Sequence, residues 1–295
     1  MNIPNFYTMN NGNLIPSIGL GVYLAGSQQT VESVTFALKN GYRLIDTASV
    51  YGNEAEVDEG IRQSGIERED LFITTKAWLS EYGSVLTPEA CKASLAKLGT
   101  NYLDLYLLHW PSPRTFDQTI EAYKAAELLV EMGLVKSIGV CNFTPTLLES
   151  LMQETMVTPA VNQIELHPYF SQIESSKFHK EHGIITQCWS PLGGIYTNHP
   201  ANPEKVIHLL RDPILADIAN QYDKTPAQVV LRWHLAHGHA VIPKSVNPER
   251  ILENMAIFDF ELTSEEMANI DSLNQNLRGS AHPDIFDLAF LSDRG

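Results

Sequence analysis

GYRLIDTASVYGNEAEVDEGI (residues 41–61) decides the fold, because it contains one complete strand–turn–helix unit. The apolar run 42–45 ends on Asp46, and a polar turn carrying Tyr51 follows. A helical pattern then covers Asn53–Gln63, with Asn53 as the expected N-cap before an acidic first turn. A short apolar strand followed at once by a helix predicts a parallel β–α unit that is buried on both faces of its strand.

Two later runs repeat this arrangement. LFITTKAW (71–78) reaches Lys76, and LDLYLLHWP (103–111) reaches His109. The carboxyl ends of parallel strands lie at the same edge of a sheet. We therefore expect Asp46, Tyr51, Lys76 and His109 to share one pocket.

Strand and helix patterns alternate along almost the whole chain at intervals of roughly 30 residues, which favours a (β/α)8 TIM barrel within the α/β class. No change of composition divides the chain, so we expect a single domain over 1–295. An N-terminal β-hairpin around Phe6–Thr8 and Leu14–Ile15 is expected to cap the barrel bottom. The strands are expected at Ile18–Val22, Arg43–Asp46, Leu71–Thr75, Leu103–His109, Val135–Val140, Ala160–Glu165, Ile184–Cys188 and Ala240–Ile242.

Turn and cap residues predict the remaining boundaries. Helix starts are expected at Thr87-Pro88, Thr144-Pro145, Thr225-Pro226 and Thr263. The irregular stretches at 197–213 and after Asn274 are expected to be loops over the pocket mouth.

Composition restricts the partners. The formal net charge is −15 and no long basic run occurs, which argues against nucleic acid as a partner. The three cysteines are far apart, which is typical of free thiols in a reducing compartment. No signal peptide and no apolar run of about 20 residues are evident, so we expect a cytoplasmic protein without a membrane segment. No coiled coil or dominant apolar stripe is evident either, and we expect a monomer.

The expected pocket has the residues that carbonyl reduction needs. Free tyrosine has a pKa of about 10, and a nearby ammonium group lowers that value. Asp46 would hold Lys76 charged beside Tyr51, and His109 could donate a hydrogen bond to a carbonyl oxygen. Tyr51 would then protonate the oxygen while hydride reaches the carbon. Because no side chain carries hydride, a nicotinamide cofactor is implied.

The usual dinucleotide fingerprint is absent. GLGVYL (19–24) has Leu24 where the third glycine of GxGxxG belongs. The alternative is IPKSVNPER (242–250), which leaves the eighth strand and enters a helix. Lys244, Ser245 and Arg250 are grouped there for a phosphate, at the late position where barrels frequently bind one.

With these motifs in place, the chain resembles the aldo-keto reductases over nearly its whole length. The motifs that carry the resemblance are GYRLIDTASVYGNEAEVDEGI (41–61), LFITTKAW (71–78), LDLYLLHWP (103–111), KSIGVCNF (136–143), VNQIELHP (161–168), WSPLGG (189–194) and IPKSVNPERILEN (242–254). The resemblance implies a (β/α)8 barrel that binds NADPH/NADP+ without a Rossmann domain and reduces aldehydes or ketones such as small carbonyls, keto-sugars or keto-esters.

The resemblance also implies roles for individual residues. Tyr51 would be the general acid, tuned by Asp46 and Lys76, and His109 would orient the substrate carbonyl. Asn142 and Gln163 would bind the nicotinamide carboxamide, and Trp189 would stack on the ring. Lys244, Ser245 and Arg250 would contact the 2′-phosphate, which favours NADP over NAD. The complete set of cofactor residues implied is Gly21, Val22, Asn142, Gln163, Trp189, Ser190, Leu192, Gly193, Lys244, Ser245, Val246, Asn247, Arg250, Glu253 and Asn254.

Two positions depart from the commonest family pattern. Cys141 stands where serine is frequent, and Trp189 stands where many members have tyrosine. Trp189, the LLHWP run and the short tail 278–284 resemble most the prokaryotic branch that includes the 2,5-diketo-D-gluconate reductases.

Several residues have two interpretations. Tyr23 and Trp78 are ordinary apolar residues or, as their places at strand ends favour, walls of the substrate pocket. Trp110 could point either way. We interpret His234, His237 and His239 as a solvated helix end rather than a metal site, because no cysteine or carboxylate joins them in series. His179 and His182 receive the same interpretation, and no metal is expected.

Two other functions would fit a barrel. Lys76 could form a Schiff base, as in an aldolase, but that chemistry needs a neutral lysine and Asp46 should keep it charged. The chain could also be a non-catalytic protein that retains a cofactor site. The intact quartet of Asp46, Tyr51, Lys76 and His109 argues against lost chemistry.

Overall fold

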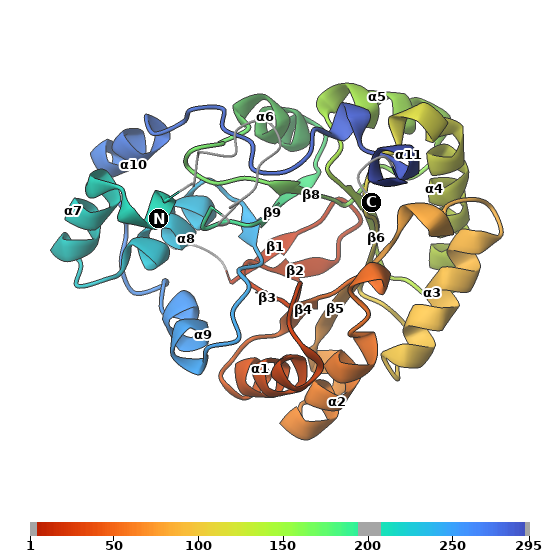
Figure 1. Cartoon of the computed structure of the whole chain (residues 1–295), viewed down its shortest axis with the longest axis horizontal. Helices are drawn as coiled ribbons and strands as arrows, with labels where there is room; N and C mark the ends of the chain where they lie inside the picture. The colour runs from red at the N-terminus through yellow and green to blue at the C-terminus, as the bar shows by residue number, and fades with distance from the viewer. Residues whose placement is uncertain (1–4, 194–207, 293–295) are drawn as a thin grey trace.

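The structure, a computed structural model, describes residues 5–193 and 208–292. Within them, a parallel eight-stranded sheet curls into a ring and most helices lie outside it (Figure 1). The expected barrel is therefore confirmed. The strands are β3 (Leu20–Gly21), β4 (Leu44–Asp46), β5 (Phe72–Ala77), β6 (Leu105–Leu108), β7 (Ile138–Cys141), β8 (Val161–Glu165), β9 (Ile185–Trp189) and β10 (Ala240–Val241).

The first and last strands close the ring. Parallel bridges join Ile18 to Val241 and Gly21 to Lys244. The Gly19 amide donates to the Val241 carbonyl at 2.8 Å. Closure satisfies the backbone groups that an open sheet would leave at its two edges.

The N-terminal hairpin covers one end of the ring. Strands β1 (Phe6–Thr8) and β2 (Leu14–Pro16) pair antiparallel, as predicted. Met9 and Ile15 are buried in one cluster with apolar side chains of the barrel interior, such as Leu44 and Leu107. The hairpin therefore closes the N-terminal end of the barrel, and the opposite end remains for a functional site.

The helices pack their apolar faces on the outside of the strands (Figure 1). The helices predicted from the sequence begin close to their predicted starts, whereas α7 was not predicted. The helix bounds are α1 (Ser27–Lys39), α2 (Glu54–Ser64), α3 (Leu86–Lys97), α4 (Phe116–Glu131), α5 (Pro145–Glu154), α6 (Ile173–Glu181), α7 (Pro213–Gln221), α8 (Pro226–Ala236) and α9 (Pro248–Met255), followed by α10 (Ser264–Asp271) and α11 (Leu288–Ser292).

The predicted caps at Thr144, Thr225 and Thr263 are confirmed, because each hydroxyl accepts from an amide in the first turn of its helix. The start expected at Thr87 is wrong: helix α3 begins at Leu86, and the Thr87 hydroxyl group instead donates to the Glu81 carbonyl. Asn53 does occupy the N-cap position of α2, as predicted, but its side chain makes no capping bond.

Two segments that the sequence suggested to be irregular contain helices. The stretch 197–213 contains the 3-10 helix Leu209–Arg211, and α7 begins at its last residue, Pro213, where the Asp212 side chain accepts from the amide of Ile214. The tail contains α11. Residues 194–207, which include most of the predicted mouth loop, lie outside the described residues. No helix in the described ranges is both long enough and apolar enough to span a bilayer.

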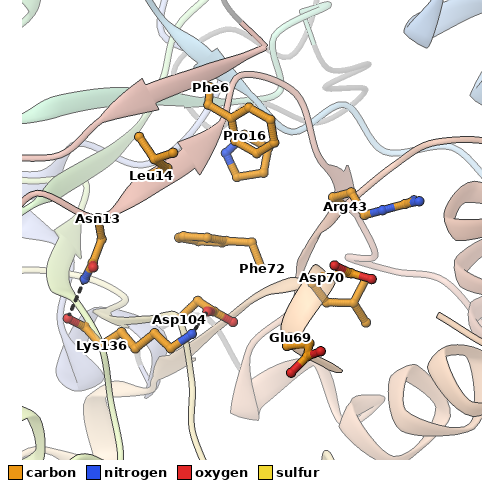
Figure 2. A pocket seen from close by; sticks show the side chains of 11 residues that line it. Phe6, Asn13, Leu14, Pro16, Arg43, Glu69, Asp70, Phe72, Asp104 and Lys136 are labelled. Carbon is orange, nitrogen blue, oxygen red and sulfur yellow. Dashed lines mark hydrogen bonds and ion pairs between the residues drawn. The ribbon is translucent and has the colours of Figure 1, made fainter. Parts of the chain in front are cut away.

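A hollow lies beside the hairpin, where the side chains of Phe6, Leu14 and Phe72 face it (Figure 2). Some of the charged groups around its rim are already engaged, since Lys136 pairs with Asp104 at 3.1 Å and Arg43 donates to two backbone carbonyls. This hollow is at the end of the barrel that the hairpin closes, opposite the strand ends where the predicted quartet is found.

Candidate active site

The strand register brings the predicted quartet together. Asp46 is the last residue of β4, Lys76 lies near the end of β5, and His109 follows β6. Tyr51 ends the 3-10 turn that joins β4 to α2. The Tyr51 and His109 ring centroids are 5.6 Å apart, and Lys76 Nζ is 5.1 Å from the Tyr51 ring centroid.

Asp46 and Lys76 form a buried ion pair. Lys76 Nζ donates to Asp46 Oδ1 at 2.5 Å and to the Thr47 carbonyl at 2.8 Å. Burial is the largest single effect and would lower the pKa of Lys76, but the charge and hydrogen bond of Asp46, together with Tyr51 and Cys141, raise it on balance. Burial raises the pKa of Asp46, and the Lys76 ammonium group opposes that effect. The lysine therefore stays charged at neutral pH.

The Tyr51 phenol is held protonated. Burial raises its pKa above the ordinary value, whereas the charge of Lys76 acts in the lowering direction. We expected Lys76 to make the phenol more acidic. Its charge does act in that direction, but the pKa of Tyr51 rises on balance, because burial of the phenolate raises the pKa by more than the lysine charge lowers it. A protonated phenol beside an ammonium group is suited to give its proton to a group that becomes an oxyanion.

His109 is neutral. Burial, reinforced by the Lys76 charge, lowers its pKa well below the ordinary value. Its Nδ1 atom is buried without a hydrogen-bond partner among the described residues. A neutral imidazole donates a hydrogen bond without serving as the main acid. Of these two groups, the protonated Tyr51 phenol is therefore the candidate proton donor.

A layer of amides lies beside the quartet. Gln163 donates to Asp46 Oδ2 at 2.7 Å and to Gln187 Oε1 at 2.8 Å. Asn142 donates to the His109 carbonyl at 3.0 Å and accepts from Trp189 Nε1 at 2.9 Å. The predicted nicotinamide contacts are thus hydrogen-bonded to the quartet and to one another.

The predicted phosphate residues lie at the start of α9. Gly21 bridges to Lys244, and the Val22 amide donates to the Asp46 carbonyl, so this segment is adjacent to the quartet. The Asn247 side chain caps α9 by accepting from the Arg250 amide. Ser245 is buried and Lys244 is exposed.

The donors present at α9 fit a phosphate. Neither Lys244 nor Arg250 forms an ion pair with any residue in the described ranges, although the chain is strongly acidic. The first turn of α9 adds backbone N–H groups and the positive end of the helix dipole. Val246 is half-buried in this segment, and Glu253 and Asn254 are in the last two turns of α9.

The third group of predicted cofactor residues follows β9. Ser190 has a left-handed backbone with φ of 46°, and the Gly193 amide donates to its carbonyl at 3.0 Å. Leu192 and Gly193 are half-buried, so this turn is accessible at the strand ends. The residue after Gly193 lies outside the described ranges.

Aromatic side chains form the walls around Tyr51 and His109. The rings of Tyr23 and Tyr51 are 4.9 Å apart, and Trp78 meets His109 edge-on at 5.1 Å. Trp110 is buried and stacks on Phe286 at 4.0 Å. Sequence reasoning missed Phe286, because no local pattern links a residue of the tail to one that follows β6.

Glu165 is a second residue that sequence reasoning missed. It ends β8 and is fully buried. Its carboxylate accepts from the amides of Gly279 and Ser280, at 2.6 and 3.0 Å, and from the Ser280 hydroxyl at 2.7 Å. These bonds fix the C-terminal tail over the strand ends, which agrees with the predicted place of the tail at the pocket mouth. The only sequence signal was an acidic residue at a strand end.

The comparisons with known proteins agree with this geometry. The sequence model of the Aldo/keto reductase family matches residues 17–275. Morphine 6-dehydrogenase of Pseudomonas putida is 43% identical over 97% of this chain and 96% of its own length. Methylglyoxal reductase DkgA of Escherichia coli is 43% identical over 96% of this chain and 98% of its own. Bacterial enzymes among the relatives agree with the prokaryotic branch expected from the sequence.

Solved structures extend the match to the fold. The crystal structure of a Bombyx mori aldo-keto reductase in complex with NADP has a TM-score of 0.87. That protein is 33% identical, and the match covers 99% of this chain and 98% of that one.

Proposed function

The chain belongs to the aldo/keto reductase family, and from this premise we propose that it reduces aldehydes and ketones to alcohols with NADPH, using Tyr51 as the general acid. The observation that carries the proposal is the position of Tyr51, a buried protonated phenol between the Lys76 ammonium group and a neutral His109. These groups supply one proton and one hydrogen bond to a carbonyl oxygen.

In the proposed reaction, NADPH supplies hydride to the carbonyl carbon. His109 orients the carbonyl oxygen by a hydrogen bond, and Tyr51 gives that oxygen its proton. The charge of Lys76 stabilises the phenolate that remains, and Asp46 keeps Lys76 in place. The Schiff-base alternative loses support, because the same ion pair keeps Lys76 protonated and therefore non-nucleophilic.

We assign the cofactor to three groups of residues. Asn142 and Gln163 would bind the carboxamide, Trp189 would stack on the nicotinamide, and the start of α9 would hold the 2′-phosphate. Lys244 and Arg250 support the last assignment, because neither forms an ion pair within the described ranges. A bidentate guanidinium is suited to a phosphate dianion.

The substrate is proposed to be a small carbonyl compound, including keto-sugars and keto-esters. The DkgA relative is named for methylglyoxal, a small dicarbonyl compound. The aromatic walls formed by Tyr23, Trp78 and Trp110 favour substrates with an apolar part next to the carbonyl group.

The test is consumption of NADPH with a panel of carbonyl compounds, each scored by kcat/KM. We expect turnover with several members of the panel. Absence of turnover throughout the panel, with NADPH bound, would instead support a binding protein. Covalent trapping of a carbonyl compound on Lys76 by borohydride would contradict the proposal outright.

The cofactor assignment has a separate test. Arg250→Ala should weaken the binding of NADPH far more than the binding of NADH, because only NADPH has the 2′-phosphate. Loss of one charged hydrogen bond should lower the affinity for NADPH by about 10-fold to 100-fold. Equal effects on both cofactors would remove the 2′-phosphate role.

A further inference from the structure

Cys188, His234 and His239 converge in space although they are apart in the sequence. Cys188 lies in β9, His234 lies near the end of α8, and His239 directly precedes β10. The Cys188 sulfur and one ring nitrogen of each histidine are all within 4.8 Å of one another. All three side chains are buried, with exposed fractions of 0%, 0% and 7%. The interpretation of these histidines as a solvated helix end is therefore wrong for two of them, and His237 alone is exposed.

The backbone holds the three residues firmly in place. The His239 amide donates to the His234 carbonyl at 3.0 Å, and the Ile242 amide donates to the Cys188 carbonyl at 3.2 Å. Cys188 also pairs in register with Val241 of β10. The cluster thus connects neighbouring strands and the helix that packs on them.

The ring nitrogens have the chemistry of metal ligands. His234 Nε2 lies 3.0 Å from the Pro191 carbonyl oxygen, which can only accept, so Nε2 carries the hydrogen. His234 Nδ1 is then a bare lone pair, and it is buried without a hydrogen-bond partner in the described part of the chain. His239 Nδ1 is buried without a partner as well. A ligating histidine generally donates its other N–H in just this way, often to a backbone carbonyl.

We propose that Cys188, His234 and His239 form a buried zinc site. The three ligand atoms are at most 4.8 Å apart, so a metal ion placed centrally among them would lie within about 2.8 Å of each. Zn–N bonds measure about 2.0–2.1 Å and Zn–S bonds about 2.3 Å. Each ligand atom therefore has to move by less than about 1 Å. One thiolate with two imidazoles is a donor set for Zn²⁺, and binding replaces the thiol proton, which leaves to solvent. The three residues leave one tetrahedral position, which a non-protein donor such as water would have to fill.

The proposed site has a structural role. Cys188 is adjacent to Trp189, and β10 leads from His239 to Lys244, so one ion would connect two segments assigned to the cofactor. Because zinc binds the folded chain through ligands that are brought together only by folding, it should stabilise the native state.

The experiment uses the full chain, expressed once with Zn²⁺ and once with Co²⁺ in the medium. We expect one zinc ion per chain by elemental analysis. The cobalt protein should show the thiolate-to-cobalt charge-transfer band and the visible bands of tetrahedral Co²⁺. Removal of the metal by a chelator should lower Tm, and added Zn²⁺ should restore it.

The variants Cys188→Ala and His239→Gln should abolish metal uptake and the cobalt bands, and Cys188→Ser provides a second replacement if alanine impairs folding. Cys91→Ala and His237→Gln are the matched controls, because Cys91 is a buried thiol and His237 an exposed histidine that are both outside the cluster. They should bind metal like the parent. Metal content that is the same in the parent and in Cys188→Ala, or a parent without a thiolate band, would overturn the proposal.

Discussion

Replacement of Lys76 by methionine separates the two roles that the structure gives to this lysine. Methionine keeps the length of the side chain but removes the ammonium group. Asp46 then retains the Gln163 hydrogen bond and loses its charged partner in a fully buried place. Breaking a buried pair by removing one partner costs about 3–5 kcal/mol, and we expect the free energy of unfolding to fall by that amount.

The catalytic effect has its own magnitude. Lys76 Nζ is 5.1 Å from the Tyr51 ring centroid. At an effective dielectric constant of about 20, a phenolate and an ammonium group at that separation attract by about 3 kcal/mol. Loss of the ammonium group should therefore raise the pKa of Tyr51 further. Alcohol oxidation, which needs the phenolate, should slow by about 100-fold at neutral pH, and its pH profile should move upward.

The assay is a double-mutant cycle of Lys76→Met, Asp46→Asn and the combined variant. Urea unfolding should show that Asp46→Asn recovers much of the stability that Lys76→Met loses, because the unpaired charge is gone. Alcohol oxidation should not recover. If Lys76→Met unfolds like the parent, or if the second change restores activity, the assignment of separate structural and catalytic roles is refuted.

Three further predictions concern other parts of the molecule. Glu165→Gln keeps one acceptor oxygen and replaces the other by an NH2 group that faces the amides of the tail. The tail should then be held less firmly, so KM for the carbonyl substrate should rise about 10-fold while the Kd for NADPH stays constant. An unchanged KM would show that Glu165 does not position the tail for substrate binding. Gly139→Ala would place a Cβ atom against the Val161 carbonyl oxygen, so β7 and β8 must separate. The free energy of unfolding should fall by about 1–3 kcal/mol, the usual cost of overpacking, and the urea midpoint should fall with it; an unchanged midpoint would contradict this. Burial lowers the pKa of His179 to about 3, so the unfolded chain binds more protons than the folded chain between about pH 6.5 and 3. This histidine should therefore reduce stability by about 2 kcal/mol at pH 5 relative to pH 7; stability that is flat over this range, measured by urea unfolding, would show that its ring is solvated.

Local signals were sufficient to predict most of the fold. Strands that are buried on both faces appear as short apolar runs, and each predicted run overlaps an observed strand. The capping box of Thr263 and Glu266 is present, as the sequence pattern indicates. Helix α7 was missed although Asp212-Pro213 has the cap-then-proline order, because its surroundings resembled a loop.

The site could be predicted only in part. Residues at strand ends converge by topology, which is why Asp46 and His109 could be placed together from the sequence. Contacts that depend on tertiary packing left no such pattern: Glu165 meets Gly279 across 114 residues, and Cys188 meets His234 only through the packing of a helix on a strand. The net pKa of Tyr51 also required the structure, because it depends on how far burial outweighs a nearby charge.

The central claim is that Tyr51 is the proton donor of a carbonyl reductase. The most direct measurement compares Tyr51→Phe with the parent for carbonyl reduction and for NADPH binding in the same preparation. Removing the hydroxyl group should lower kcat by about 100-fold to 10,000-fold, the usual contribution of a general acid, while the Kd for NADPH stays constant. Turnover close to that of the parent would contradict the claim, and so would a loss of turnover explained by lost NADPH binding.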